Sequence, residues 1–278
     1  MPHTSLVKLQ ETNGHVCVAF YGLTRSLRLT HSSIEEFLLE PLRAHAQRLS
    51  VFVHTYNLSE ITNKRSQEQS ARLNHSEFHL LRPTRFKVGD QDAFDATINV
   101  SAYTSQGDPW KDGWRSLRNL LRMENSLQEV TDLWMEFQPP CWRVVVTRPD
   151  LLLLNPFNVT DMHMVSPRFW MVPEFASWGG INCRFAMGDF EGMALYGKKF
   201  DWIRAYSKAA PLHTESMLKA RALNLGITVR NTRMCSVRVR ATGQIQSSDL
   251  TELPRKPDIC RTCCALMRHA FINATTPN

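Results

Sequence analysis

A β-branched run that ends at a proline is the feature that most constrains this fold. The run Val144–Thr147 consists of three valines and a threonine. An unbroken run of this kind is typical of a strand that is buried on both faces of a covered parallel sheet. Pro149 lacks an amide proton for a sheet ladder, so we expect regular pairing to stop there. Arg148 and Asp150 therefore lie just after the carboxyl end of a buried strand, which is where ligands bind in open α/β sheets.

These two charged residues allow two interpretations. An arginine presents a planar fork of donors that matches phosphate, and a carboxylate at the same edge can hold a hard cation. The alternative is a plain ion pair between Arg148 and Asp150 that closes the strand. The stretch by itself does not separate them.

The beginning of the chain predicts a strand, a turn, a helix and a second strand. His15–Tyr21 is the first apolar run, and a turn with Gly22 and Arg25 follows it. N-cap residues at Ser32 and acids after it predict a helix start, and Val51–Tyr56 predicts the next strand. Glycine lets the backbone approach a phosphate and Arg25 could clamp it, although ordinary loop chemistry is the alternative.

The middle of the chain contains its longest helical pattern. Apolar residues recur at helical spacing over Trp110–Phe137, and residues 58–108 predict loops and short elements over the sheet edge. Asn119, Arg122 and Ser126 form a polar stripe on the helix. The stripe is either solvated or faces a nucleotide pocket.

A glycine-containing loop follows the strand expected at Arg168–Pro173. It carries Gly180, Asn182 and Arg184, and Asp189 is placed to cap the next helix. A loop of this composition that leads into a helix suits a phosphate or an acceptor. The alternative is a tight turn between strand and helix.

His213 and Glu215 open the following helix, which we expect to end near Gly226. Both side chains can serve as a base or as metal ligands, with simple capping as the alternative. Short strands are expected at 227–230 and 236–240.

The alternation of strands and helices predicts an α/β fold: a mostly parallel, doubly wound sheet with helices on both faces, in a single domain. We expect an N-terminal extension at 1–14, the domain at 15–245 and a polar, cysteine-containing tail at 246–278.

Composition narrows the class of partner. The net charge of +7 suits an anionic ligand, but the basic residues are scattered along the sequence, which argues against nucleic acid. No apolar run approaches a membrane span and no signal peptide is apparent. A cytoplasmic protein is the default expectation. Sequons at Asn57, Asn74, Asn99, Asn158 and Asn273 leave a luminal or Golgi protein open if an anchor is missing.

The seven cysteines are an odd number. Cys17, Cys141 and Cys183 lie in apolar or strand-like surroundings, so we expect buried thiols rather than bridges. The tail groups three cysteines and a histidine, which gives only a weak zinc signal beside a tail bridge or free thiols. These residues are Cys260, Cys263, Cys264 and His269.

Four stretches, taken in order, resemble a family of nucleotide-sugar glycosyltransferase-like proteins with a GT-A fold, and the resemblance runs from about residue 16 to 240. The stretches are Val18–Arg25, Thr147–Leu151, Gly179–Ala186 and His213–Glu215. The resemblance implies that Gly22 and Arg25 lie over the nucleotide diphosphate. It places the Arg-Pro-Asp segment where GT-A enzymes hold a divalent ion, and it places the Asn-x-Arg and His-x-Glu segments on the donor-sugar and acceptor side.

Two departures from that family pattern are visible. Only Asp150 stands in the metal motif, so Arg148 is an alternative source of positive charge. Cys183 lies between Asn182 and Arg184, where members carry an acid, and this implies an altered donor or an inactive protein.

The expected function is therefore transfer of a sugar from a nucleotide-diphosphate donor to a hydroxyl of a glycan or glycoconjugate. Mn or Mg on Asp150 is expected to assist the leaving diphosphate. The candidate bases, in order, are Glu215, Asp189 and His213. The rival hypothesis is a catalytically inactive sugar- or nucleotide-binding domain.

Overall fold

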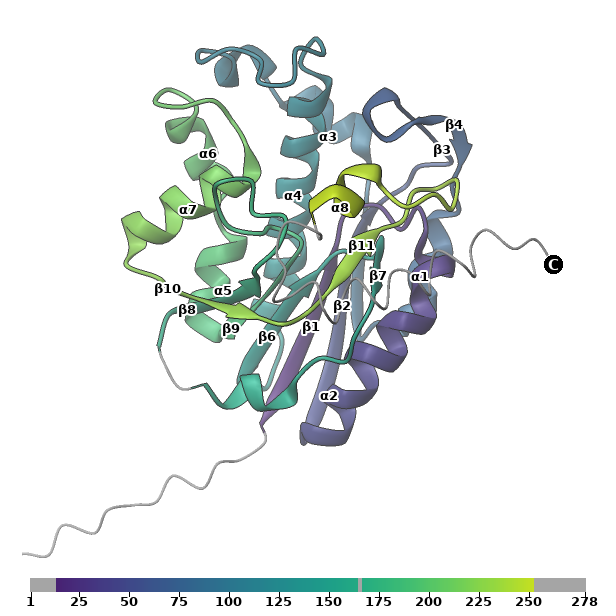
Figure 1. Cartoon of the computed structure of the whole chain (residues 1–278), viewed down its shortest axis with the longest axis vertical. Helices are drawn as coiled ribbons and strands as arrows, with labels where there is room; N and C mark the ends of the chain where they lie inside the picture. Colours follow the sequence, from purple (N-terminus) through teal and green to yellow (C-terminus); the bar gives the residue numbers. More distant parts are fainter. Residues whose placement is uncertain (1–13, 165–166, 253–278) are drawn as a thin grey trace, which may run out of the picture.

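A seven-stranded sheet lies at the centre of the computed structural model, which describes residues 14–164 and 167–252 (Figure 1). Its strand order is β10-β8-β9-β6-β1-β2-β5. The strands are β1 (His15–Tyr21), β2 (Arg48–Tyr56), β5 (Arg85–Gly89), β6 (Arg143–Thr147), β8 (Phe169–Pro173), β9 (Phe185–Asp189) and β10 (Thr228–Thr232). Only β9 runs against its neighbours, so the mostly parallel sheet is confirmed.

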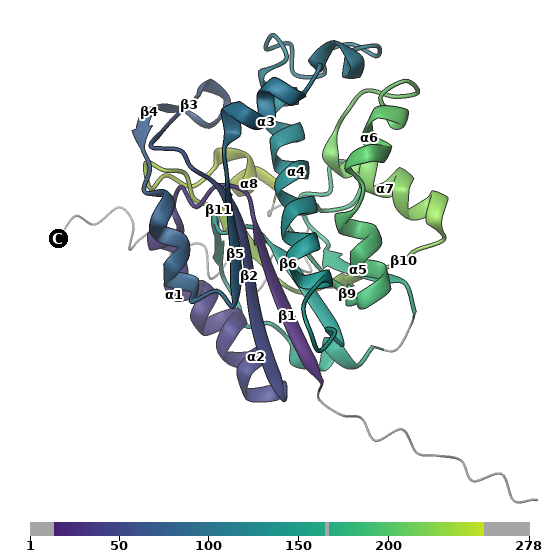
Figure 2. The same ribbon diagram turned by 180° about the vertical axis from the view of Figure 1, so that it is seen from behind.

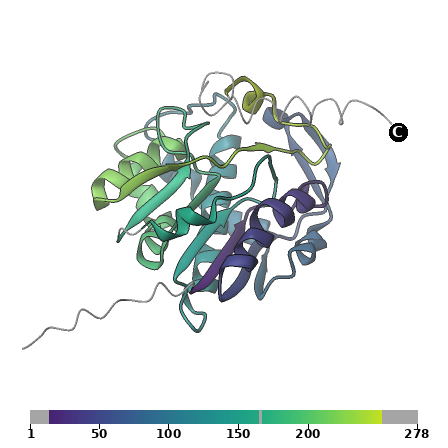
Figure 3. The same cartoon turned by 60° about the horizontal axis from the view of Figure 1, so that its bottom comes forward.

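Helices cover both faces of this sheet, as expected for a doubly wound fold (Figures 1 and 2). The helices are α1 (Leu27–Ile34), α2 (Glu40–His45), α3 (Gln91–Thr97), α4 (Arg115–Met135), α5 (Phe190–Gly197), α6 (Phe200–Tyr206), α7 (Thr214–Leu225) and α8 (Ser247–Glu252). Figure 3 shows the purple α1 and the green α6 and α7 on different sides of the molecule. Two short sheets complete the domain: β3 (Glu60–Asn63) with β4 (Glu68–Arg72), and β7 (Leu151–Leu153) with β11 (Ser236–Arg238).

Strand β1 divides its side chains between two apolar cores, because successive residues of a strand point to opposite faces. One set packs with α1 and α2, and the other packs with α4, α5 and α7. The first set is Val16, Val18 and Phe20, and the second is Cys17, Ala19 and Tyr21. All of them are buried, so both faces of the sheet are covered at its centre.

The β-branched run identified in the sequence forms β6, the fourth strand in the order of seven. Every residue of β6 is buried, as a doubly covered strand requires. Pairing with β1 ends at Thr147, two residues before Pro149. The structure therefore confirms both the central strand and its stop.

The helix after β1 starts at Leu27, earlier than the expected start at Ser32, and it contains a π-helical stretch at Glu35–Leu39. Pro41 explains that stretch, because proline lacks an amide proton and crowds the carbonyl four residues earlier. The carbonyl of Phe37, which Pro41 cannot bond, accepts the amide of Phe157 at 2.7 Å. The irregular helix thereby gains a long-range contact.

The expectation of free thiols at Cys17 and Cys141 was wrong, because these residues form a disulfide across 124 positions. Cys183 is a buried free thiol, as expected. Cys235 is also disulfide-bonded. Cys260, Cys263, Cys264, His269 and Asn273 lie outside the described residues.

A short helix lies just beyond residue 245, in the segment expected to form the polar tail. Residues 247–252 form α8, and its Asp249 is fully buried against Arg238. Within the described residues, no helix is long and apolar enough to cross a membrane.

Candidate active site

A cleft of about 340 Å³ opens at the carboxyl ends of β1 and β6. The chain leaves β1 toward β2 and β5 on one side and returns as β6 on the other, so the strand order reverses at this point. Such a switch point is where open α/β sheets bind ligands. Gly22 and Arg25 after β1, Arg148 after β6 and Asn119 of α4 line the cleft.

The turn after β1 is fixed by the polar stripe of α4. Gly22 has a φ of +95°, a conformation that glycine adopts without strain. Its amide donates to the hydroxyl of Ser126 at 2.8 Å, and that hydroxyl also lies 2.7 Å from Nδ1 of His54. The stripe thus contributes Asn119 and Arg122 to the lining, while Ser126 anchors the turn.

Asp150 lies directly behind the lining and is buried. Its carboxylate accepts two hydrogen bonds from Arg148, at 2.8 and 2.7 Å, and two from Arg25, at 2.8 and 3.3 Å. Nη1 of Arg240 lies 3.9 Å from the same group. Burial alone would raise the pKa of Asp150, but Arg148 and Arg25 outweigh it and hold that pKa well below its usual range.

This arrangement does not fit a divalent cation on Asp150. Both carboxylate oxygens are taken by guanidinium donors, and a cation would meet two or three positive charges beside them. Within the described residues, the one group of three side chains close enough to share an ion is His15, Cys17 and Cys141, and its cysteines are bridged. The positive charge at this edge of the sheet comes from Arg148 and Arg25.

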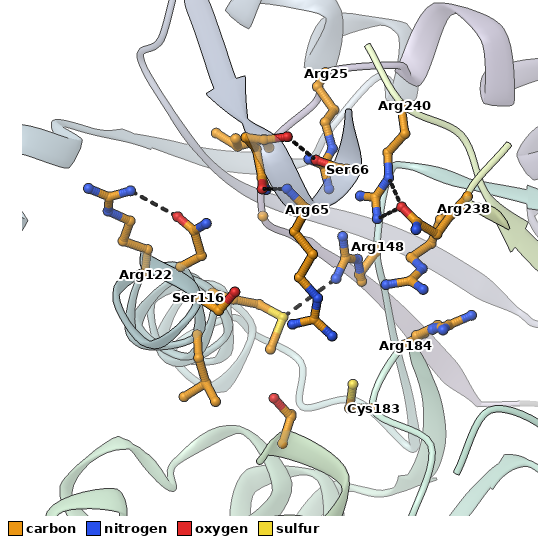
Figure 4. Close-up of a pocket in the computed structure, with 18 of the residues that line it drawn as sticks. Arg25, Arg65, Ser66, Ser116, Arg122, Arg148, Cys183, Arg184, Arg238 and Arg240 are labelled. Carbon is orange, nitrogen blue, oxygen red and sulfur yellow. Dashed lines mark hydrogen bonds between the residues drawn. The ribbon is translucent and has the colours of Figure 1, made fainter. Parts of the chain in front are cut away.

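Arginine dominates the lining of the cleft (Figure 4). The arginines are Arg25, Arg65, Arg122, Arg148, Arg184, Arg238 and Arg240. Among the described residues of this lining, Glu215 is the one carboxylate. The basic residues that are scattered in the sequence therefore converge in space, from the first turn, the β3–β4 connection and the segment after β10.

Three of these arginines were not predicted as site residues from the sequence. Arg65 lies in a short 3₁₀ turn at Lys64–Ser66, inside the segment that was expected to be irregular. Arg238 and Arg240 come from the end of the segment that contains β11. Their i, i+2 spacing, which puts both side chains on one face of a strand, was the available signal.

The glycine-containing loop before β9, which includes Gly179 and Gly180, contributes Arg184 to the cleft. Asn182 does not reach the cleft, because its amide donates to the carbonyl of Phe175 at 2.7 Å and its oxygen accepts the amide of Arg184 at 2.8 Å. Gly180 is also structural: a Cβ there would lie 2.0 Å from the carbonyl oxygen of Glu215. Gly180 thus lets the loop pack closely against α7, where the amide of Ile181 donates to the carbonyl of Glu215 at 3.0 Å, and Asn182 bonds within the loop itself.

Glu215 and His213 lie together in the lining at the start of α7. Nδ1 of His213 is 3.4 Å from a carboxylate oxygen of Glu215, and the ring stacks on Trp110. The thiol of Cys183 donates to the other oxygen of Glu215 at 3.5 Å. Burial raises the pKa of this thiol and the charge of Glu215 raises it further, so the thiol stays protonated.

The list of candidate bases needs one correction, because Asp189 lies away from the cleft. It pairs with Arg143 in the sheet register, whereas the cleft lies beyond Thr147 at the other end of β6. Its carboxylate accepts the amides of Gly192 at 3.3 Å and Arg168 at 3.2 Å. The expected helix cap is confirmed, and that role places Asp189 away from the cleft.

Arg122 and Asn119 lie on the α4 side of the lining. Arg122 makes a two-pronged ion pair with Asp95 and donates to the side-chain oxygen of Asn119 at 3.0 Å. Its charge is thereby balanced locally, unlike the charges around Asp150.

No family model and no curated protein matches this sequence. Among solved structures, the chain is similar to the galactosyltransferase LgtC in complex with donor and acceptor sugar analogs, at 11% identity and a TM-score of 0.40, over 79% of this chain and 74% of that one. It is similar to an active-site mutant of LgtC at 11% identity and a TM-score of 0.41, over 79% and 73%. At these values the likeness is too remote for the activity or the site residues of LgtC to carry over.

Proposed function

We propose that this protein binds a nucleotide-sugar donor in the arginine-lined cleft and transfers its sugar to a hydroxyl of a glycan or glycoconjugate. The observation that carries the proposal is the gathering of arginines at the β1–β6 switch point, in a lining whose described residues include a single carboxylate, Glu215. Guanidinium forks match phosphate oxygens and stay charged at physiological pH. The cleft therefore offers both an anion site and a base.

Transfer breaks the bond between the anomeric carbon and the diphosphate, and the diphosphate departs with the bonding electrons. Arg148 and Arg25 are held on Asp150 before any ligand arrives. They supply positive charge where the negative charge develops, and a preorganised charge of this kind lowers the barrier. Asp150 acts in this scheme as the residue that positions the two arginines.

In a transfer that inverts the anomeric centre, the acceptor oxygen forms the new bond to the same carbon and its proton passes to a base. We assign this role to Glu215, and its place as the carboxylate among the described lining residues supports the assignment. His213 lies beside it at 3.4 Å and restricts its orientation. A carboxylate that accepts a proton in the transition state contributes about 10²–10⁴-fold to the rate.

Trp178 supports an acceptor side in the cleft. It lines the cleft, its side chain is exposed, and its φ is +45°. A bulky residue in this backbone region is strained, and such strain occurs most often at ligand sites. The exposed ring offers an apolar face to a sugar ring.

A catalytically inactive domain that binds a nucleotide sugar is the second candidate. Cys183 favours it, because a protonated thiol lies in the lining where the resembling family carries an acid. The two candidates share the anion site and differ in turnover.

The test is an assay of nucleoside diphosphate release from a panel of nucleotide sugars, with and without a glycan acceptor mixture. We expect turnover in the wild type and a loss of about a hundredfold in Glu215→Gln, with no loss of affinity for the nucleoside diphosphate. Glu191→Gln is the matched control, because Glu191 is an exposed residue of α5 outside the cleft lining. Binding without turnover would select the inactive domain, and the absence of both would contradict the proposal.

A further inference from the structure

The cleft carries more arginine than carboxylate, even when the buried acids behind it are included. Setting aside Arg122, which pairs with Asp95, six arginines line it. Four carboxylates line it or form ion pairs with those arginines. The arginines are Arg25, Arg65, Arg148, Arg184, Arg238 and Arg240, and the carboxylates are Glu68, Asp150, Glu215 and Asp249. Among the described residues, these arginines therefore outnumber these carboxylates by two.

Burial makes this excess unfavourable in the protein without a ligand. Arg184 and Arg240 are buried, and Arg25 is nearly so. Burial lowers the pKa of Arg240, and the neighbouring Arg25 lowers it further. A guanidinium resists deprotonation. A bound anion, rather than the loss of a proton, would therefore relieve this repulsion.

Several guanidinium donors remain available to such an anion. Nη1 of Arg184 is buried and has no hydrogen-bond partner among the residues that the structure describes. Within the same residues, the hydrogen-bond partner of Nη1 of Arg148 is the sulfur of Met123, at 3.6 Å. Arg65 forms no ion pair within the described part of the chain, and its guanidinium extends into the space between α4, Arg148 and Cys183 (Figure 4). These donors come from three separate segments and face one cavity.

We infer that these arginines neutralise the diphosphate of the donor themselves and that the donor binds without a divalent cation. A nucleotide sugar carries one negative charge on each of its two phosphates, which matches the two uncompensated positive charges of the cleft. A divalent cation on the diphosphate would leave those charges unpaired again. The inference rests on the proposed function and names the chemistry by which the donor is held.

The experiment is isothermal titration of UDP, GDP and ADP, and of the corresponding nucleotide sugars, into the full chain in EDTA and in MnCl₂. We expect equal affinity in the two buffers for the nucleotides that bind. Arg65→Gln should weaken that binding about tenfold, because it removes one charge-assisted contact. This variant should fold, since Arg65 is exposed and unpaired within the described residues. Arg43→Gln is the control, because Arg43 pairs with Glu35 outside the cleft lining.

The outcomes separate the two proposals. Binding that requires MnCl₂ would overturn the inference and leave the proposed function standing. Equal binding in both buffers with no effect of Arg65→Gln would overturn the assignment to these arginines. No binding of any probe in either buffer would overturn the inference together with the proposed function.

Discussion

Asp150 organises the cleft by holding two guanidinium groups that the chain brings from positions 25 and 148. A buried carboxylate and its arginines interact strongly only while all partners are present, because each charge has lost its hydration. The residue thus acts through the arginines it positions.

Asp150→Asn should lower the free energy of unfolding by about 3–5 kcal/mol, because it leaves buried guanidinium groups without their counter-charge. Urea denaturation of the variant and the wild type measures this difference. Asp92→Asn, at an exposed position of α3, is the control and should change it little. A variant as stable as the wild type, with Mn²⁺ stabilising only the wild type, would instead make Asp150 a metal ligand.

Trp178 permits a test of the acceptor side that leaves the anion site intact. Trp178→Ala should raise the KM for the acceptor about tenfold, since truncating a tryptophan at a binding surface is among the most costly changes. The affinity for the nucleoside diphosphate should not change. Trp178→Phe keeps an aromatic face and should recover most of the loss. A parallel loss of nucleotide affinity would argue against an acceptor role.

At the scale of elements, the disulfide between Cys17 and Cys141 ties β1 to the segment that leads into β6. These two strands are the ones whose carboxyl ends carry Arg25 and Arg148. The bridge lies at the opposite end of the same pair of strands, where Cys17 pairs with Val144. It secures the strand pair from which the cleft extends.

Replacing both cysteines by serine should therefore lower the free energy of unfolding by about 2–5 kcal/mol, as expected for a bridge that closes a long loop. Denaturation under non-reducing conditions gives the value. The chain offers Cys183→Ser as a comparison, because Cys183 is a free thiol. If the double variant matches the wild type in stability, the bridge contributes nothing to the strand pair.

Some elements could be predicted because their signals are local. The β-branched run of β6, the Asp189 cap of α5 and Gly226 at the end of α7 each depend on a few neighbouring residues. Strand β5 was missed although Phe86 and Val88 alternate with Arg85 and Lys87, because the run is short and its side chains lie largely exposed at the edge of the sheet.

At the scale of the whole molecule, the site depended on contacts that no local pattern contains. Asp150 and Arg25 are 125 positions apart in the chain, so the sequence did not reveal that arginines would take both oxygens of the expected metal ligand. Arg65 likewise reaches the cleft from a segment with no regular signal. The location at the switch point was predictable from strand order, whereas its charge balance was not.

The central claim is that the arginine cluster at the β1–β6 switch point binds the diphosphate of a nucleotide sugar. The most direct measurement is a crystal structure of the full chain with the nucleoside diphosphate that gives the largest thermal stabilisation. The account predicts phosphate oxygens within hydrogen-bond distance of Arg148 and Arg65 in the cleft, with Asp150 still paired to Arg25. A nucleotide bound at another surface, with the cleft empty at saturating concentration, would contradict it.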